Sequence, residues 1–331
     1  MMHLQNRIRK IAVVASAGLL LSACGTAQSL DPADEEGIAQ LSLGTFPNTS
    51  LSLPVAVAEK AGFFEAVKLD VTTVSGKSGP ELTAALIGGT TQIAGGAPES
   101  TFSALRDGQN LVVIPPVAAL NYMIMAKADV ASGGVGGLKG KRIGVPARGS
   151  AAEAFARTVL SDNGLDPETD VTFVAVGGSA TVVPAYAQGQ IDASVGSPST
   201  MAALRGQGFD ATAMIDAADG GAGDLGEYGF GGFFTTTTDV VEKSPMVLHR
   251  FCEAMRSSTA YIADPVNRDS VITTLSEVMK LPEASVVPIY EAERTLWTNN
   301  ISEERWNKNA EWVLGPDAAK APFRTSANSC S

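Results

Sequence analysis

The sequence is poor in the residues on which metal sites and hydrolytic triads depend. It has three cysteines and two histidines in 331 residues, and it contains no Walker sequence. If the first 23 residues are removed, the only histidine left is His249, beside Arg250 on a predicted helix. Zinc sites and Ser-His-Asp triads would have to use that one residue, so both are disfavoured. We therefore expect no metal, no other cofactor and no enzyme of these classes.

Basic residues are also scarce, with 24 Lys and Arg against 35 Asp and Glu and a net charge of −11. Such a surface repels phosphate backbones, so nucleic acid is not expected as a partner. No stretch after the N-terminus reaches 18 apolar residues, so the body of the chain is expected to contain no membrane-spanning helix. The hydrophobic fraction of 45% is nevertheless sufficient for a buried core.

The N-terminus has the pattern of an export signal. A basic segment, residues 1–10, precedes an apolar run, residues 11–21, that is too short to span a bilayer. It ends in Leu-Ser-Ala-Cys-Gly, which resembles the bacterial lipobox. We predict a signal peptide at 1–23 and a lipidated Cys24 with its tether at 24–38, which would anchor the protein on the extracytoplasmic face of the cell membrane. The alternative is an ordinary secretory signal with an incidental cysteine.

The rest of the chain contains one α/β unit twice, about 100 residues apart. Each copy begins with a strand, a turn-forming loop and a helix, at residues 41–60 and 141–161. Each continues with a second strand and a helix, and then with a short strand, a turn containing small residues and proline, and a new helix, at 92–100 and 190–200. Alternating strands and helices predict an α/β fold of two lobes, each with a mostly parallel sheet flanked by helices.

We expect three segments: a first part of lobe one at 39–125, lobe two at 126–234, and the return to lobe one with the C-terminal helices at 235–331. Residues 121–127 and 233–238 are predicted to cross between the lobes as hinge strands. The late helices, expected at Pro245–Ile262, Asn267–Met279, Glu283–Trp297 and Glu303–Val313, should pack on lobe one. Ligands of open parallel sheets bind beyond the carboxyl ends of the strands, which predicts a site between the lobes of a monomer.

Lobe one offers polar and aromatic residues at these strand ends. The candidates are Phe46, Asn48, Thr49 and Ser50 from the first loop, Ala97, Glu99 and Ser100 after the third strand, and Tyr122 and Phe233 from the crossing strands. Turn formation, helix-dipole stabilisation by Glu99 and core packing of the aromatics are the alternatives. If Glu99 faces the site, it selects a ligand that donates hydrogen bonds or carries positive charge.

Lobe two offers the start of its first helix. Gly149 permits a close backbone approach, Arg148 supplies charge, and the free N–H groups favour an anion. Ser150 and Glu153 also form a capping-box pattern, in which the helix end is satisfied by its own side chains. Both roles stay open and can coexist. Ser197 is the lobe-two equivalent of the residues after the third strand.

Two further cysteines, Cys252 and Cys330, remain in the body of the chain. Export would permit a disulfide bond between them. Cys252 falls in a predicted helix, where a small buried apolar residue is the alternative.

The order of these motifs resembles one protein family. Residues 54–65 and 69–71, Leu-Lys-Gly-Lys-Arg-Ile-Gly-Val-Pro at 138–146, and the segments at 163–167 and 189–193 are similar to solute-binding proteins of ABC importers. The relatives take up nitrate, sulfonates and taurine, or pyrimidine precursors of thiamine. The resemblance covers about residues 41–312. It implies a type II periplasmic-binding-protein fold, a small polar or anionic organic solute, and a partner permease with its ATPase.

Within that resemblance the solute class stays open among sulfonate, taurine, nitrate, aromatic acid and thiamine-precursor pyrimidine. Residues 46–49 and 97–101 are similar to the pyrimidine branch, although Pro-Glu-Ser stands here where that branch has Pro-Ser-Glu-Ser. Two other functions are the alternatives: an enzyme on the same fold, such as a pyrimidine-precursor synthase or a dehydratase, and a ligand-sensing subunit of a membrane receptor.

Overall fold

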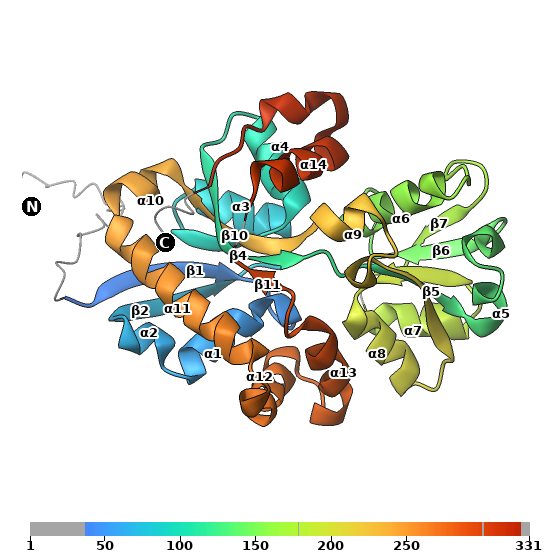
Figure 1. Cartoon of the computed structure of the whole chain (residues 1–331), viewed down its shortest axis with the longest axis horizontal. Helices are drawn as coiled ribbons and strands as arrows, with labels where there is room; N and C mark the ends of the chain where they lie inside the picture. Colours follow the sequence, from blue (N-terminus) through green and yellow to red (C-terminus); the bar gives the residue numbers. More distant parts are fainter. Residues whose placement is uncertain (1–36, 178, 300, 326–331) are drawn as a thin grey trace, which may run out of the picture. The chain divides into compact units, whose positions relative to one another are not determined.

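The computed structural model describes residues 37–177, 179–299 and 301–325, all within one compact unit. The predicted signal peptide, Cys24 and Cys330 lie outside the described residues. Within them, every helix is too short or too polar to cross a membrane. Two separate sheets organise this part of the chain (Figure 1).

The sheet of lobe one has six strands in the order β11-β4-β10-β3-β1-β2. β1 runs parallel to β2 and β3, whereas β10 is antiparallel to β3 and β4, and β11 is antiparallel to β4. Because β1 and β3 are parallel, Phe46 and Ala97, which follow them, lie at the same edge. The strands are β1 (Ala39–Thr45), β2 (Leu69–Ser75), β3 (Ile93–Gly96), β4 (Leu111–Ala119), β10 (Phe230–Thr237) and β11 (Trp297–Thr298).

The sheet of lobe two has five strands in the order β7-β6-β8-β5-β9. β6 is parallel to β7 and β8, and β5 is antiparallel to β8 and β9. Pro146, Val176 and Ser197 therefore follow parallel strands at one edge. The strands are β5 (Met123–Lys127), β6 (Arg142–Val145), β7 (Thr172–Ala175), β8 (Ala193–Gly196) and β9 (Ala211–Asp216).

Helices flank both sheets, as the alternating pattern predicts (Figure 1). Lobe one carries α1 (Leu53–Lys60), α2 (Phe63–Ala66), α3 (Gly79–Ile87), α4 (Pro98–Arg106), α10 (Thr238–Lys243), α11 (Pro245–Ala263), α12 (Arg268–Met279), α13 (Glu283–Glu293) and α14 (Glu303–Leu314), with the 3-10 turns Ser50–Ser52, Pro265–Asn267 and Gly315–Lys320. Lobe two carries α5 (Ala128–Ala131), α6 (Ala151–Asp162), α7 (Ser179–Ala187), α8 (Pro198–Gly206) and α9 (Asp224–Tyr228), with the 3-10 turns Val135–Leu138 and Ala217–Asp219.

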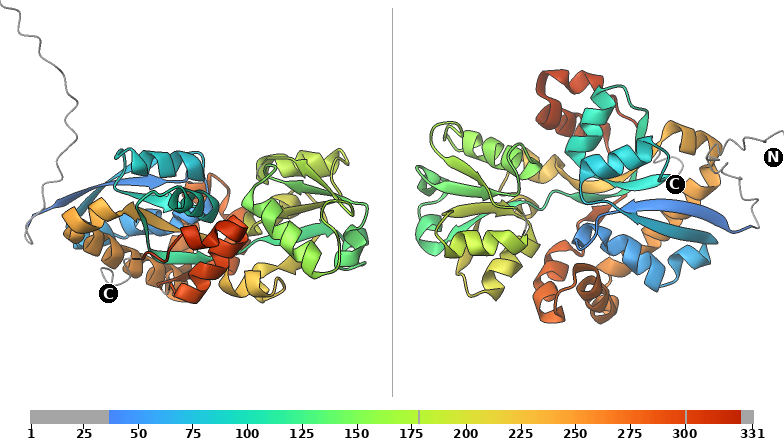
Figure 2. Two further views of the ribbon diagram at one scale, coloured as in Figure 1. Left: turned by 90° about the horizontal axis from the view of Figure 1, so that it is seen from above. Right: turned by 180° about the vertical axis from the view of Figure 1, so that it is seen from behind.

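The strands of lobe two are contiguous in the sequence, whereas the sheet of lobe one takes β10 and β11 from the part of the chain that follows lobe two. β10 follows lobe two in the sequence and lies between β3 and β4, side by side with β4 in both views of Figure 2. β5 follows β4 directly and pairs only with β8 and β9. The first crossing segment is thus short, at residues 120–122. The return to lobe one passes through residues 217–229, which contain the 3-10 turn Ala217–Asp219 and α9.

The prediction that residues 121–127 and 233–238 cross between the lobes as hinge strands is therefore wrong. β5 and β10 are each hydrogen-bonded on both sides within one sheet, so neither is shared between the lobes. The boundaries expected after residues 125 and 234 cut through these two strands. Alternation of apolar residues marks a strand but does not say which sheet it joins.

The late helices differ from expectation in one place. α11, α12 and α14 match the predicted segments within two residues at each end, but α13 ends at Glu293 and Trp297 lies in β11. Trp297 pairs with Ala118 of β4, and this strand pairing replaces the predicted last turns of the helix. α13 also packs on α8 of lobe two, so the late helices do not pack on lobe one alone.

The cores follow from the apolar pattern. Strand β4, Leu-Val-Val-Ile-Pro-Pro-Val-Ala-Ala, is buried along nearly its whole length, as a continuous apolar run predicts for a strand covered on both faces. Helix α11 packs Leu248, Phe251 and Met255 against this sheet, each with 0% exposure. Cys252 of the same helix is buried and disulfide-bonded, while its expected partner Cys330 lies outside the described residues, so that pairing stays a prediction.

Candidate functional site

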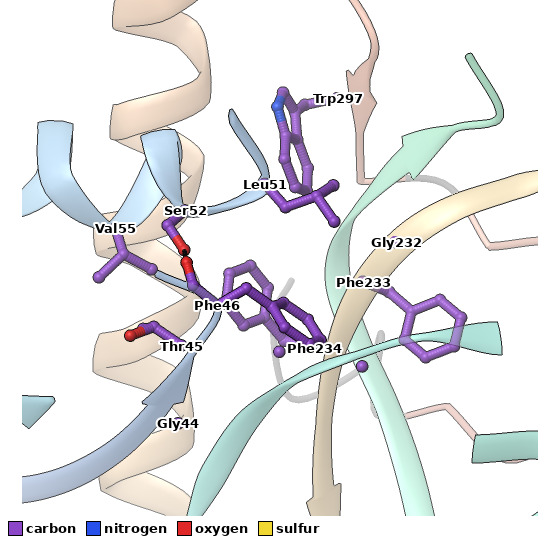
Figure 3. Close-up of a pocket in the computed structure, with 12 residues that line it drawn as sticks. Gly44, Thr45, Phe46, Leu51, Ser52, Val55, Gly232, Phe233, Phe234 and Trp297 are labelled. Atoms are coloured by element: carbon purple, nitrogen blue, oxygen red, sulfur yellow. Dashed lines mark hydrogen bonds between the residues drawn. The ribbon is translucent and has the colours of Figure 1, made fainter. Parts of the chain in front are cut away.

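Aromatic side chains fill a small pocket at the carboxyl ends of β1 and β3 (Figure 3). Its free volume of about 10 Å³ is close to the space of one water molecule. The candidates Phe46 and Phe233 line it, and their contact with a solute stays a prediction, whereas Leu51 and Trp297 were not among the candidates. The lining residues are Gly44, Thr45, Phe46, Leu51, Ser52, Val55, Gly95, Gly96, Gly232, Phe233, Phe234 and Trp297.

Glycines let these rings lie directly against the strands. A Cβ atom on Gly95 would lie 3.1 Å from the Phe46 ring, and one on Gly96 would lie 2.6 Å from the Phe233 ring. The second distance is shorter than non-bonded carbon atoms tolerate. The pocket therefore depends on the absence of side chains at the end of β3.

The first loop satisfies its own polar groups. Asn48 is exposed with φ of 56°, a conformation that asparagine tolerates. The Thr49 hydroxyl accepts a hydrogen bond of 3.4 Å from the N–H of Leu51, and the Ser52 hydroxyl donates to the carbonyl of Phe46. Turn formation, the alternative role for this loop, is thus present.

Ser50 contacts Glu293, a residue that was not predicted from the sequence. Glu293, the last residue of α13, is 8% exposed and hydrogen-bonds to the Ser50 side chain. Asn121, on the crossing segment, donates from Nδ2 to Glu293 Oε1 at 3.0 Å. Burial raises the pKa of Glu293 to about 7, although both hydrogen bonds oppose the shift. Glu293 lies 172 residues from Asn121, so no local pattern could reveal it.

Lobe two contains a larger cavity of about 170 Å³ beside the crossing segment. Its walls are mostly apolar, with hydroxyl groups from Tyr122, Ser197 and Thr200. Tyr122 and Ser197 were predicted as site residues. The lining residues are Tyr122, Pro146, Ala152, Val176, Gly177, Val182, Val195, Gly196, Ser197 and Thr200.

Glu99 acts electrostatically on Tyr122, which lines this cavity. Burial raises the pKa of the Tyr122 phenol, and the nearby charge of Glu99 raises it further. Burial likewise raises the pKa of Glu99, opposed by a hydrogen bond from its own backbone N–H. The Glu99 side chain, from α4, therefore lies within electrostatic range of Tyr122 on the crossing segment. The Tyr122 ring also packs edge-on against Phe155 at 5.9 Å between centroids.

The remaining candidates that follow β3 and β8 make hydrogen bonds in the first turns of α4 and α8. The Ser100 hydroxyl donates to the Ala97 carbonyl at 3.1 Å and accepts from Thr83 Oγ1 at 3.3 Å, which fixes the first turn of α4. In lobe two, the hydroxyls of Ser197 and Ser199 are 2.7 Å apart. Ser197 thus combines a local contact with a place in the cavity wall.

The helix start in lobe two adopts the capping arrangement. Glu153 Oε2 accepts from Arg148 Nε at 2.9 Å and from the Gly149 N–H at 2.8 Å, and the Ser150 hydroxyl accepts from the Glu153 N–H at 3.4 Å. Arg157 pairs with the other Glu153 oxygen at 2.7 Å. Burial opposes ionisation, but these contacts hold the pKa of Glu153 below its usual range. The Arg148 charge is therefore directed at Glu153.

Among the described residues, no group of three or more His, Cys, Asp and Glu side chains could hold a metal ion. His249 lies on the exposed face of α11. Apart from the Trp297 indole, the polar side chains that line these two cavities carry hydroxyl groups, which suit binding by hydrogen bonds.

Comparison with known proteins bears on the family and the fold of the chain. The sequence model of the family described as NMT1/THI5 like matches residues 50–267. A search of curated protein sequences found no significant match.

Solved structures with the same fold cover nearly the whole chain. The alkanesulfonate-binding protein SsuA of Xanthomonas axonopodis pv. citri, bound to MOPS, is 22% identical, with a TM-score of 0.67 over 89% of this chain and 98% of that one. The aliphatic sulphonate-binding SsuA of Escherichia coli is 18% identical, with a TM-score of 0.71 over 87% and 96%. The nitrate-binding NrtA of Synechocystis PCC 6803 is 12% identical, with a TM-score of 0.66 over 89% and 87%. The expected periplasmic-binding-protein fold is confirmed.

Proposed function

The chain belongs to the NMT1/THI5-like family, and from that membership we propose that it captures a small solute outside the cytoplasm and delivers it to an ABC importer. The observation that carries this proposal is the cavity of about 170 Å³ beside Tyr122, at the carboxyl ends of parallel strands. Its apolar walls with a few hydroxyl groups are typical of a site that encloses a small molecule.

Binding rather than catalysis fits the groups around this cavity. A nucleophile activated by a base needs a hydrogen-bonded pair, such as Ser with His. Among the described residues, Ser197 and Thr200 in the cavity wall are hydroxyls, and His249 is on the exposed face of α11. An enzyme on the same fold stays the second candidate, because fold alone does not decide function.

The proposal extends to location and partners. Cys24, in the lipobox-like pattern, would carry the lipid that anchors a monomer to the extracytoplasmic face of the membrane. A permease and its ATPase would receive the solute. Cys24→Ala should release the protein from the membrane fraction, and retention of the variant would contradict a lipid anchor.

Ligand-induced stabilisation tests the capture function. The full chain, purified in detergent, is heated with nitrate, ethanesulfonate, taurine, benzoate or 4-aminopyrimidine. A solute at about 100 times its Kd stabilises the folded state by about 2.7 kcal/mol, which raises Tm by several degrees. Stabilisation by one class, without chemical change of the solute, supports capture. Turnover of the solute would instead support the enzyme.

A further inference from the structure

The cavity of about 170 Å³ in lobe two has an uncharged wall. Its apolar part comes from proline, alanine, valine and glycine residues, and its polar part from the hydroxyl groups of Tyr122, Ser197 and Thr200. The aromatic pocket of lobe one likewise has no lysine, arginine, aspartate or glutamate among the described residues that line it. An ion enclosed by such walls loses water without gaining a counter-charge, which costs far more than burial of a neutral polar group.

The start of α6 adjoins this cavity, because Ala152 in its first turn belongs to the wall. The cation next to it is engaged, since Arg148 Nε donates to Glu153 Oε2 at 2.9 Å. Arg157 pairs with the other Glu153 oxygen at 2.7 Å, and the Gly149 N–H donates to the same carboxylate at 2.8 Å. The helix therefore already holds the anion that its dipole favours, supplied by a side chain that is 3% exposed.

The start of α8 lies on the same cavity and is not filled in this way. Ser197 precedes the helix, Thr200 is in its first turn, and that turn contains no acidic residue. Hydroxyl groups both donate and accept hydrogen bonds, and the N-terminal end of a helix favours a partial negative charge. An amide group fits both, because its carbonyl oxygen accepts and its N–H groups donate.

The cations that α14 brings to the return segment are engaged as well. Arg305 donates to the carbonyls of Tyr228 and Gly229 at 2.9 and 2.8 Å. Lys308 pairs with Asp224 at 2.7 Å. A negatively charged solute would have to compete with these partners for a counter-charge.

We propose that the solute is uncharged, that it carries an amide-like group which hydrogen-bonds to the hydroxyls of the lobe-two cavity, and that Glu153 excludes organic anions by filling the start of α6. This inference rests on the proposed capture function and names the solute class for it. The sulfonate-binding and nitrate-binding proteins of the same fold bind anions, so this chain would differ from them in the charge of its solute.

Two isosteric pairs of compounds test the inference. Benzamide and benzoate have nearly the same shape and size, as do benzenesulfonamide and benzenesulfonate. At pH 7 only the second member of each pair carries a charge. Affinities are measured by titration calorimetry on the full chain in detergent. We expect each neutral compound to bind at least tenfold more tightly than its anionic counterpart.

A charge-removing variant assigns the preference to Glu153. Glu153→Gln keeps the size of the side chain but leaves Arg148 without its carboxylate, so the preference for benzamide over benzoate should fall at least threefold. Glu168→Gln is the matched control, because it removes the same charge from an exposed pair with Arg157 and should leave the preference unchanged. Circular dichroism establishes that each variant is folded. If Glu153→Gln does not fold, the isosteric pairs on the unmodified chain decide the question.

A hydroxyl-removing variant tests the place of binding. Tyr122→Phe keeps the ring and removes one hydroxyl from the cavity wall, so benzamide affinity should fall about threefold to tenfold, as for the loss of one hydrogen bond. Tyr261→Phe removes the same group from α11 of lobe one and should leave the affinity within about twofold. An unchanged affinity in Tyr122→Phe would place the solute outside this cavity and overturn the inference.

The outcomes separate this inference from the capture function. Tighter binding of benzoate or benzenesulfonate than of its neutral counterpart overturns the inference and leaves capture standing. Stabilisation by nitrate, ethanesulfonate or taurine with no binding of a neutral ring compound has the same consequence. An unchanged preference in folded Glu153→Gln overturns the role of Glu153. If no compound of either panel binds, both proposals are overturned.

Discussion

The two lobes have the same arrangement of parallel strands but treat buried acidic groups differently. In both, the first strand lies between the second and third, and an antiparallel strand follows the third. In lobe two, Glu153 is paired with two arginines and a backbone N–H. In lobe one, Glu99 is partly exposed and Glu293 is buried, and neither has an arginine or lysine among its described partners. The same strand topology therefore carries an acid paired with arginines in lobe two and acids without a cationic partner in lobe one.

The comparison teaches that a helix start can bind an external anion only when no carboxylate of the same chain already accepts its free N–H groups. The Arg-Gly-Ser-Ala pattern at 148–151 contains the ingredients of such a site, yet Glu153 satisfies them within one helical turn. The glutamates of lobe one lack such neighbours, so their partners must come from the crossing segment, from distant helices or from a ligand.

Removal of the paired acid should have the largest effect. Glu153→Ala would leave two arginines facing a buried gap, and breaking a buried ion pair costs about 3–5 kcal/mol. We expect a loss of that order in the free energy of unfolding, measured by urea denaturation. Glu168→Ala is the matched control, because its exposed pair with Arg157 is worth less than about 1 kcal/mol. Equal losses in the two variants would contradict the assigned role of Glu153.

Glu293, the buried acid of lobe one with no described arginine or lysine partner, should make the free energy of unfolding depend on pH. The folded-state pKa of Glu293 is about 7, against an ordinary value of 4.5. Between these values the folded state holds a proton that the unfolded state has lost, so this contribution to stability is complete below pH 4.5 and decreases as pH rises to 7. The total is about 3 kcal/mol.

Glu293→Gln removes that titration and keeps an acceptor for Asn121. The difference in unfolding free energy between the unmodified chain and Glu293→Gln should therefore shift with pH, in favour of the variant, from pH 4.5 to 7. Urea denaturation at four pH values measures it. A difference that stays constant across this range would show that Glu293 is ionised like an exposed glutamate.

The glycine end of β3 offers a steric test of the aromatic pocket. In Gly96→Ala the new Cβ would lie 2.6 Å from the Phe233 ring and 2.9 Å from Thr235 Cγ2. Overpacking of this kind costs about 1–3 kcal/mol, which thermal unfolding detects. Gly136→Ala is the control, because no atom lies within 4 Å of its Cβ position and it has no positive φ. A neutral Gly96→Ala would mean that the pocket rearranges easily.

Arg148→Ala should have the smallest effect and decides between two roles for that residue. Its side chain is 57% exposed and its charge is directed at Glu153, so we expect a stability loss below about 1 kcal/mol. Solute affinity should stay within about twofold. A tenfold loss of affinity would place Arg148 in the site, as its position at a helix start allows.

Much of the fold was predictable because its signals are local. The strand–loop–helix order, the helix at Leu53–Lys60 and the capping of α6 by Ser150 each depend on residues within a few positions of one another. Phe46, Tyr122 and Ser197, chosen for their place near strand ends, line the two cavities, and their contact with a solute stays a prediction. The failures were β5, β10 and α13, where pairing with a distant strand decided the outcome.

What the sequence by itself determined is the set of elements, their order and the strand edge at which polar groups gather, because periodicity and capping act over short distances. Only the tertiary structure decided which charges are paired. Glu153 accepts a hydrogen bond from Arg148 five residues away, but Glu293 accepts one from Asn121 across 172 residues, and Glu99 acts electrostatically on Tyr122 of the crossing segment. Burial then shifts the ionisation of the unpaired acids, because removing a charge from water costs free energy that only a nearby partner can offset.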